Sequence, residues 1–297
     1  MNIFTNRSCP NCDQADGDLV LEMQASRIAE NSYSRPFFLT HLGFPENTLF
    51  PIVRCRHCRF VYSQRLLNSD LLDALYERMI SEQNDRRHEE SLYMTKVYAG
   101  IFTLLLHSMT GENSSLKLLD FGGGTGAFCQ VANAPQIQPI CFETSQRRLR
   151  LIRAKGLNVI TRFEEVATHG PYDMILCNQV LEHVPQPKQI LKTFERVLNP
   201  GGRAYLAVPA YPEETLARNA ELYRAGGRYP LDLNPWEHLN YFSPDSFRSM
   251  LGDCGLAPLI WPLPEVDFTG EKAVYGFMSN AHPALPWTSA IVKKASA

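Results

Sequence analysis

Leu118-Leu119-Asp120-Phe121-Gly122-Gly123-Gly124-Thr125-Gly126 joins a short apolar run to a cluster of glycines. The apolar run ends in an acidic residue, and a helix-like segment follows the glycines. Glycine permits positive φ angles and lets a ligand approach the backbone closely. The stretch therefore predicts a strand, a tight turn and a helix N-terminus that together bind a nucleotide.

The sequence after this turn alternates between strand-like and helix-like segments. We expect strands at Leu116–Phe121, Gln138–Glu143, Leu157–Thr161, Tyr172–Asn178 and Arg203–Pro209. We expect helices that begin at Gly126, Ser145, Pro187 and Ser243, and two last strands near Leu256–Pro262 and Lys272–Met278. Such alternation is typical of a parallel α/β sheet whose ligands bind at the carboxyl ends of the strands.

The composition is that of a globular protein and disfavours several functional classes. The chain has 297 residues, 44% hydrophobic residues and a net charge of −2. Nucleic-acid binding is disfavoured because the chain has no global basic field. No apolar run approaches the ~18 residues of a membrane span, and Met1–Pro10 lacks the apolar core of a secretory signal. We therefore expect a cytoplasmic protein.

Four of the eight cysteines form two pairs, Cys9-Pro-Asn-Cys12 and Cys55-Arg-His-Cys58. One C-x-x-C turn supplies two thiolates, so two such turns complete a tetrahedral zinc site. The intervening segment is longer than in a usual zinc ribbon, and we expect Leu19–Pro51 to form a sizeable loop or hairpin. The alternatives are four reduced core cysteines or a redox pair. His57 is either a substitute ligand or a solvated residue.

These features divide the chain into four expected regions. Residues 1–65 form the zinc-binding module, and residues 66–115 form a helical linker or lid. Residues 116–280 form the cofactor-binding domain, and residues 281–297 form a tail. Residues 210–243 are expected to be a substrate lid, because a long polar loop inside a compact domain is usually a binding element.

Glu143 follows the second expected strand and lies about 20 residues after the first glycine of the turn. An acidic residue at this place can accept hydrogen bonds from both ribose hydroxyls of an adenosine. The glycine spacing differs from the G-x-G-x-x-G of nicotinamide dehydrogenases, because the third position of that pattern is absent. The alternative for Glu143 is a solvated acid at a strand end.

From about Leu116 to Met278 the sequence resembles the class I S-adenosylmethionine (SAM)-dependent methyltransferases. The motifs that carry the resemblance are Leu119–Gly126, Glu143, Tyr172–Val184 and Arg196–Gly202. The resemblance implies an α/β fold with a Rossmann-like seven-stranded sheet of order 3-2-1-4-5-7-6, in which strand seven is antiparallel. The small N-terminal zinc-binding module would be attached to this sheet.

The resemblance also implies which residues contact the cofactor. Those expected to hold its methionine and ribose parts are Phe121, Gly122, Gly124, Glu143, Thr144, Asn178 and Gln179. Phe163 is expected beside the adenine, and Asp120 is expected to orient the turn or the amino group through water. Glu182 and His183 are expected to form a structural turn, with catalysis as the alternative.

The segment Glu237-His238-Leu239-Asn240-Tyr241-Phe242-Ser243 is similar to a sequence box of the deoxysugar C-methyltransferases, which also begin with a cysteine zinc module. The resemblance implies that Glu237 and His238 are acid–base groups. A histidine with a pKa of ~6.5 suits proton transfer at neutral pH, and Glu237 would fix its tautomer or act as a partner base. The alternative is that His238 caps the following helix or fills a hinge.

Two departures limit what the box implies about the substrate. Pro235-Trp236 stands where those enzymes have Tyr-His, and their third domain has no counterpart in this sequence. We therefore expect methyl transfer to an oxygen or carbon of a small polar metabolite, such as a sugar, a nucleotide sugar or a natural-product intermediate. The alternatives are an RNA methyltransferase whose zinc module holds RNA and a non-catalytic scaffold that binds SAM and zinc. A homodimer is left open.

Overall fold

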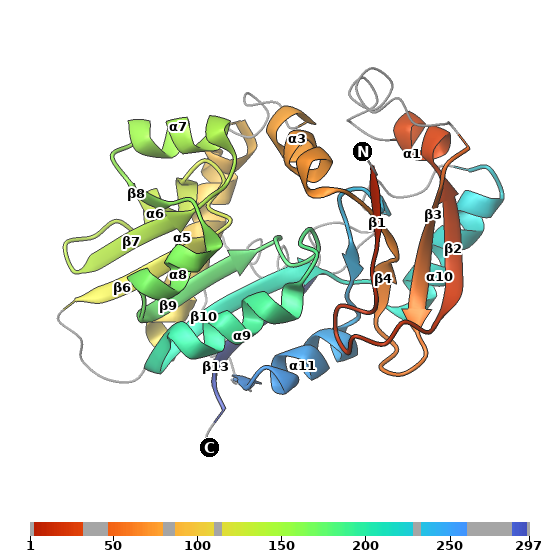
Figure 1. Ribbon diagram of the computed structural model, residues 1–297. Coiled ribbons are helices and arrows are strands. Elements are labelled where there is room, and N and C mark those ends of the chain that lie inside the picture. The colour runs from red at the N-terminus through yellow and green to blue at the C-terminus, as the bar shows by residue number, and fades with distance from the viewer. Residues whose placement is uncertain are drawn as a thin grey trace. The chain divides into compact units, whose positions relative to one another are not determined.

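The computed structural model describes residues 3–31, 47–79, 87–109, 115–227, 233–259 and 287–295 (Figure 1). Contacts within the chain divide it into two compact units. Unit 1 comprises Met1–Ser81, Leu181–Lys188 and Pro209–Phe247. Unit 2 comprises Glu82–Val180, Gln189–Val208 and Arg248–Ala297. The chain therefore passes between the two units several times.

Unit 2 is built on a seven-stranded sheet in the order β12-β13-β10-β9-β6-β7-β8. Its strands are β6 (Leu116–Phe121), β7 (Ile137–Phe142), β8 (Asn158–Ile160), β9 (Tyr172–Asn178), β10 (Leu198–Pro209), β12 (Leu256–Pro258) and β13 (Trp287–Lys294). The strands from β8 to β10 run parallel, whereas β13 is antiparallel to β12. Counted from β6 in chain order this is 3-2-1-4-5-7-6, which confirms the expected fold class.

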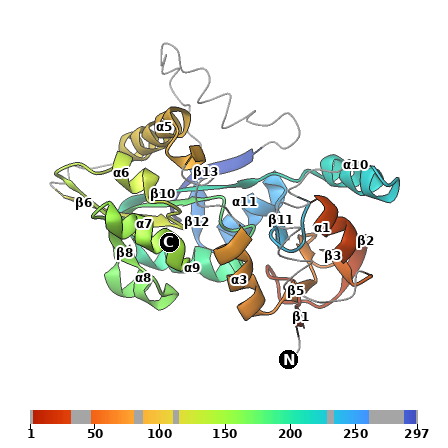
Figure 2. The same ribbon diagram turned by 90° about the horizontal axis from the view of Figure 1, so that it is seen from above.

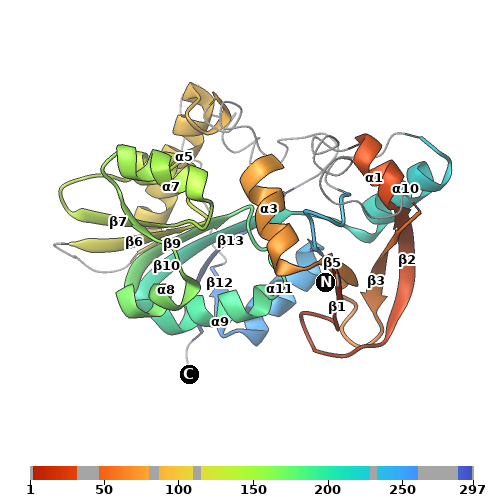
Figure 3. The same cartoon turned by 45° about the horizontal axis from the view of Figure 1, so that its top comes forward.

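Helices cover both faces of this sheet, which explains why its central strands are almost wholly apolar. One face packs against α5 (Leu92–Ser108), α6 (Ala127–Val131) and α7 (Gln146–Ala154) in a common core. The other face carries α8 (Phe163–His169) and α9 (Pro187–Val197), as Figure 3 shows. The start of α7 follows from the sequence, because the Ser145 hydroxyl accepts a hydrogen bond from the Arg148 N–H.

The end of the chain differs from expectation. β13 lies between β10 and β12 (Figure 2), so the expected tail 281–297 is wrong over Trp287–Lys294. The expected strand Lys272–Met278 lies outside the described residues. The run Ala290-Ile291-Val292 has the β-branched character of a buried strand, and Val292 is fully buried. The strand was not predicted because the apolar run is short and lysines follow it.

Unit 1 contains a four-stranded antiparallel sheet in the order β11-β4-β3-β2. Its strands are β2 (Gly17–Gln24), β3 (Leu49–Cys55), β4 (Val61–Ser63) and β11 (Asn240–Tyr241), while β1 (Phe4–Asn6) pairs with β5 (Arg65–Leu67). The helices assigned here are α1 (Ala25–Asn31), α3 (Ser69–Met79) and α10 (Glu213–Arg224), and α11 (Pro244–Asp253) follows β11. The pairing of β2 with β3 confirms the hairpin expected between the cysteine pairs.

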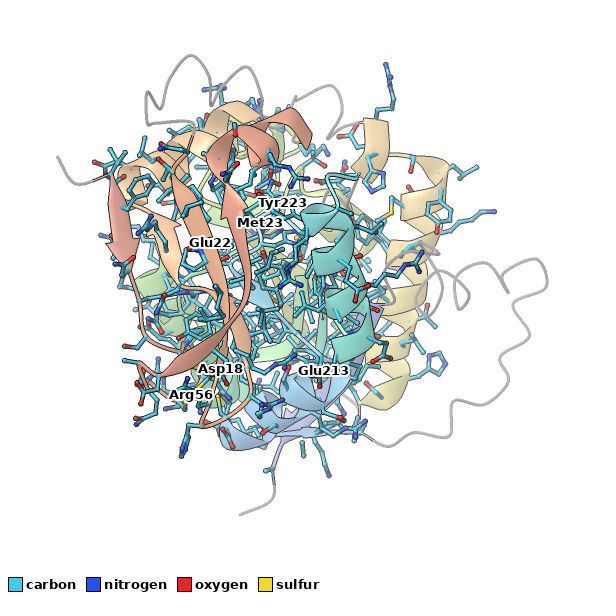
Figure 4. All side chains as sticks on the ribbon, turned by 90° about the vertical axis from the view of Figure 1, so that its right-hand side faces the viewer. Asp18, Glu22, Met23, Arg56, Glu213 and Tyr223 are labelled. Carbon is cyan, nitrogen blue, oxygen red and sulfur yellow. The ribbon has the colours of Figure 1, made fainter. Side chains whose placement is uncertain are left out.

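The helix α10 falls within the stretch that we expected to be a polar loop. Its buried side chains include Leu216, Ala220 and Tyr223, and the Gln24 N–H donates a hydrogen bond of 2.7 Å to the Tyr223 hydroxyl. Figure 4 shows α10 lying along β2, with Tyr223 near Met23 and Glu213 at the far end of the helix. This narrow apolar stripe among charged residues explains why the helix was missed.

The grouping of segments also differs from the four expected regions. The stretch Pro209–Phe247, expected as a lid on the cofactor-binding domain, belongs to unit 1. The expected linker 66–115 is shared, because α3 lies in unit 1 and α5 forms part of the core of unit 2. No helix in the described ranges is long and apolar enough to span a membrane.

Candidate functional site

The glycine turn lies at the carboxyl end of β6, an inner strand of unit 2 between β9 and β7. The N–H groups of Gly122 and Gly123 both donate hydrogen bonds of 2.9 Å to the Phe142 carbonyl, which ties the turn to β7. Gly122 has a φ of 81° and Gly124 a φ of 53°. A Cβ on Gly122 would lie 2.5 Å from Val180 Cγ2, so a larger residue does not fit. The turn thus has the shape expected from the sequence.

Two carboxylates accept the N–H groups of this turn. Glu143 lies at the end of β7 and is 6% exposed. Its Oε2 accepts a 3.1 Å hydrogen bond from the Gly124 N–H, and its Oε1 accepts from the N–H groups of Thr144 and Ser145. Glu89, which precedes α5, accepts a 2.8 Å hydrogen bond from the Thr125 N–H. Glu89, which precedes β6 in the chain, therefore completes the turn. The sequence analysis did not predict this contact.

A third acid, Asp120, is buried beneath the turn. Burial first, and then the nearby carboxylate of Glu89, raises the pKa of Asp120 to about 8. The acidic groups make the turn a poor site for the pyrophosphate of a dinucleotide, which needs unoccupied N–H donors and positive potential. The carboxylates of Glu89 and Glu143 suit a cofactor with a net positive charge at its centre, as SAM has in its sulfonium and ammonium groups.

The other expected cofactor residues lie at the same edge of the sheet. Asn178 ends β9, the neighbour of β6, and Gln179 follows with a φ of 57°. Within the described part of the chain, Gln179 Nε2 and Thr125 Oγ1 are buried without a hydrogen-bond partner. These orphaned polar atoms fit a site that is completed by a ligand.

The aromatic residues divide into two roles. The Phe121 ring stacks on Phe142 at 4.5 Å and packs edge-on against Phe194 at 5.0 Å. Its side chain therefore belongs to the core, and only its backbone faces the turn. Phe163 begins α8, and its ring meets Phe121 edge-on at 6.1 Å. Thr144 is exposed, next to Glu143.

The four paired cysteines of unit 1 come together in one cluster. Their Sγ atoms all lie within 4.8 Å of one another. The separations of Cys9 from Cys58 and of Cys12 from Cys55 are both 3.5 Å. The two C-x-x-C turns share a backbone conformation, because Asp13 and Arg59 have φ angles of 61° and 64°. Four thiols in two matched turns fit a closed tetrahedral metal site.

His57 and the thiol of Cys12 show how the surroundings of the cysteine cluster compare with the expectations. His57 is exposed, as expected of a solvated residue in the second turn. Burial raises the pKa of the Cys12 thiol to about 11. The metal candidates of this cluster are therefore the four cysteines named from the sequence.

A second cluster in unit 1 joins Glu182, His183 and His238, whose ligand atoms lie within 4.8 Å of one another. His183 Nε2 lies 3.6 Å from Glu182 Oε1, and the two imidazole ring centres are 4.7 Å apart. Glu182 is 1% exposed and His238 is 8% exposed. The sequence analysis assigned Glu182 and His183 to a structural turn, with catalysis as the alternative. The adjacent Glu-His pair, a few residues after the end of β9, was the signal that could have identified this cluster.

Each imidazole of this cluster has its Nδ1 held by another group. His183 Nδ1 lies 2.9 Å from the carbonyl oxygen of Glu237, and His238 Nδ1 lies 3.3 Å from the Tyr211 hydroxyl. Glu237 Oε1 accepts a 2.8 Å hydrogen bond from Asn234 Nδ2 in its own turn. The structure thus brings Glu182 to His238, while Glu237 contributes its backbone carbonyl to the cluster.

Comparisons with known proteins show the family to which the chain belongs. Residues 87–259 match a family model described as a methyltransferase domain. The ubiquinone biosynthesis O-methyltransferase of Bordetella bronchiseptica is 25% identical over 190 residues, which cover 59% of this chain and 75% of the relative. The corresponding protein of Bordetella avium is 25% identical over 170 residues, 52% of this chain and 67% of the relative.

A solved structure shares the fold. It is the plantazolicin methyltransferase BamL, in complex with a triazolic desmethylPZN analog and SAH. The TM-score is 0.54 at 13% identity, and the match covers 75% of this chain and 94% of that chain.

Proposed function

Because this chain belongs to the methyltransferase family and is a SAM-dependent enzyme, we propose that it methylates an oxygen or carbon atom of a small polar metabolite. The observation that carries the cofactor part of the proposal is the glycine turn bracketed by Glu89 and Glu143, with Asp120 buried beneath it. The relatives are O-methyltransferases by name, which favours an oxygen acceptor. A sugar, a nucleotide sugar or a natural-product intermediate is the proposed substrate class.

The residues named from the sequence have distinct proposed tasks in holding SAM. The backbone of Phe121, Gly122 and Gly124 forms the cradle, and the Glu143 carboxylate accepts the ribose hydroxyls. Thr144 lies beside Glu143 and Phe163 beside the adenine. Gln179, with Asn178, binds the methionyl part, and the orphaned Gln179 Nε2 supports this role. The bound cofactor supplies a methyl group that a sulfonium already activates, so alignment is the larger task of the protein.

On the acceptor side, we propose that His238 is the group that handles the proton. Its Nδ1 is held by the Tyr211 hydroxyl, which leaves Nε2 as its other ring nitrogen. A positioned base of this kind contributes about 10²–10⁴-fold to the rate. Glu237 supports His238 through the turn that its carboxylate and carbonyl organise.

We also propose that Cys9, Cys12, Cys55 and Cys58 bind a structural Zn²⁺ ion. The support is the approach of all four Sγ atoms within 4.8 Å and the matched conformation of the two turns. Such a site is closed to substrate and acts by holding the fold of its module.

The experiment that tests the cofactor assignment is calorimetric titration with S-adenosylhomocysteine. Glu143→Ala should weaken binding by at least about tenfold, because it removes the acceptor of the Gly124, Thr144 and Ser145 N–H groups and of the ribose. Glu164→Gln, on the exposed surface of α8, is the matched control and should bind as the wild type does. Equal affinity in the Glu143 variant, or no binding by the wild type, would contradict the proposal.

A further inference from the structure

We propose that Glu182, His183 and His238 bind a divalent metal ion of the zinc class and leave one coordination position open for a hydroxyl of the methyl acceptor. This site is separate from the cysteine cluster and is built from two segments of unit 1. The proposed use of the ion rests on the proposed function, whereas ion binding itself is independent of that function.

The spacing of the ligand atoms favours a metal ion over a direct hydrogen bond. His183 Nε2 and Glu182 Oε1 are 3.6 Å apart, beyond the usual range of a hydrogen bond. Two ligands at about 2.1 Å from a tetrahedral ion are about 3.4 Å apart, close to the observed distance. An ion between these atoms therefore needs only small side-chain shifts.

The outer contacts of both imidazoles have the pattern of metal ligands. A metal-binding histidine usually gives its second ring nitrogen to a carbonyl, carboxylate or hydroxyl, which fixes the ring and its tautomer. His183 Nδ1 meets the Glu237 carbonyl at 2.9 Å, and His238 Nδ1 meets the Tyr211 hydroxyl at 3.3 Å. In both residues the other ring nitrogen is Nε2, which is the proposed ligand atom.

Burial gives the cluster a reason to hold a cation. Glu182 is 1% exposed, and buried charged groups in proteins are paired or coordinate metals. His238 is 8% exposed, so the surroundings contain little water that could screen the charge. A divalent ion compensates the carboxylate and uses the neutral form of both imidazoles.

The ligand sets of the two clusters predict different kinds of site. Four cysteines saturate a tetrahedral ion, as in structural zinc sites. Two histidines and one carboxylate leave a position for water or substrate, as in catalytic zinc sites. Three ligand residues gather at the second cluster in the described part of unit 1, so its fourth position remains for an exogenous oxygen.

This arrangement changes how the acceptor loses its proton. An acceptor oxygen bound at the open position has a lowered pKa, so its O–H bond breaks at neutral pH and the proton passes to water. The oxygen then forms a bond to the methyl carbon while the carbon–sulfur bond of the sulfonium breaks, and sulfur keeps the electron pair. His238 serves the loss of the proton in this step as a ligand of the ion, and water takes up the proton.

The test counts zinc by mass spectrometry after the full chain has been loaded with Zn²⁺ and desalted. The wild type should carry about two zinc ions per chain, and His183→Asn should carry about one. Asparagine can still donate to the Glu237 carbonyl but lacks the Nε2 ligand, so it removes the ion with little effect on the turn. His169→Ala, an exposed histidine of α8, is the control and should keep both ions.

Variants of the two clusters distinguish the two ions. Cys12→Ser should lose the ion of the cysteine cluster, which His183→Asn should keep. A wild type that carries about one ion, retained in His183→Asn and lost in Cys12→Ser, would overturn the proposal. Circular dichroism of each variant separates loss of an ion from loss of the fold.

A second measurement, of Mn²⁺ binding, tests the site even if one of the variants above does not fold. Mn²⁺ prefers nitrogen and oxygen ligands to thiolates, so its binding reports on the histidine cluster alone. Electron paramagnetic resonance should show Mn²⁺ binding to the wild type and at least about tenfold weaker binding to Glu182→Gln. Absence of Mn²⁺ binding by the wild type would contradict the proposal. S-adenosylhomocysteine titration in parallel tells failure of this site from failure of the proposed function.

Discussion

The glycine turn of unit 2 and the Glu182–His183–His238 cluster of unit 1 are assembled in opposite ways. The turn takes Asp120 to Gly126 from one stretch of chain, and Glu143 joins it from the adjacent strand. The histidine cluster takes residues from two distant segments, and Tyr211, from the same segment as His238, contacts His238. A site made from contiguous residues has a readable spacing, whereas a site made across segments depends on tertiary contacts that the sequence does not display.

The same contrast holds for what stabilises each unit. Unit 2 has a continuous apolar core in which Leu118, Phe128 and Ile152 pack with the rest of one face of the sheet. Unit 1 joins three separate chain segments and contains both sulfur and histidine clusters. We therefore expect unit 1 to depend on its cysteine site, and unit 2 to depend on burial of apolar surface.

The largest expected effect comes from removing the cysteine site. Cys55→Ser should abolish zinc binding by this cluster and unfold much of unit 1 at 25 °C, because a structural zinc ion contributes about 10 kcal/mol of folding free energy. Unit 2 should still bind S-adenosylhomocysteine. The measurements are zinc content, thermal unfolding followed by circular dichroism, and calorimetric titration.

The matched control for this change is Cys254→Ser. Cys254 is a buried cysteine of unit 2 that lies outside the sulfur cluster. The zinc content of the Cys254→Ser variant should equal that of the wild type. If Cys55→Ser left the unfolding temperature unchanged, the contrast between the two units would be lost.

A smaller effect is expected from Asp120 in unit 2. Burial, followed by the Glu89 carboxylate, raises its pKa to about 8, above the unfolded value near 3.9. The folded state then holds a proton that the unfolded state has released, so the contribution of Asp120 is full below about pH 4 and is lost as pH rises through 8. Asp120→Asn should be more stable than the wild type at pH 9, by up to about 5 kcal/mol.

Urea unfolding between pH 5 and 9 measures this difference. The Asn variant should lose less stability than the wild type over this range, and Glu164→Gln on the exposed face of α8 should follow the wild type. Parallel curves for the wild type and Asp120→Asn would show that the carboxyl group is already ionised in the folded protein.

The strands of unit 2 were predictable because each signal is local. Tyr172–Asn178 is an apolar run bounded by a proline and a polar turn, and its predicted and observed limits are the same. Ser145 and Gly156 marked the ends of α7 by capping chemistry that depends only on neighbouring residues. All eight expected cofactor residues lie in unit 2, although their roles stay predictions.

The parts that were missed depend on contacts between distant residues. The apolar side of α10 is buried in unit 1, where the helix contacts β2 through pairs such as Gln24 with Tyr223. Glu89 joins the glycine turn from 36 residues before Thr125, and nothing in its local sequence marks it. Glu182 was visible as a motif, but its approach to His238 follows from the way the segments of unit 1 fold together.

The smallest expected effect tests how those segments are joined. Asn240 is fully buried in β11, and its Nδ2 donates hydrogen bonds of 2.8 Å to the carbonyls of Leu181 and Val184. Its Oδ1 accepts a hydrogen bond from Arg7, which belongs to the first segment of unit 1. Asn240→Ala should lower the free energy of unfolding by about 1–3 kcal/mol, because it leaves buried polar groups without partners.

Asn219 provides a matched control in the same unit. It is also a buried asparagine, on α10, and in the structure as described its Nδ2 has no hydrogen-bond partner. Asn219→Ala should therefore change stability by less than about 1 kcal/mol, and alanine is also the better helix former. Urea unfolding of both variants compares them directly. If both variants lost the same free energy of unfolding, burial alone would account for the loss. The hydrogen bonds of Asn240 would then not be what joins the segments of unit 1.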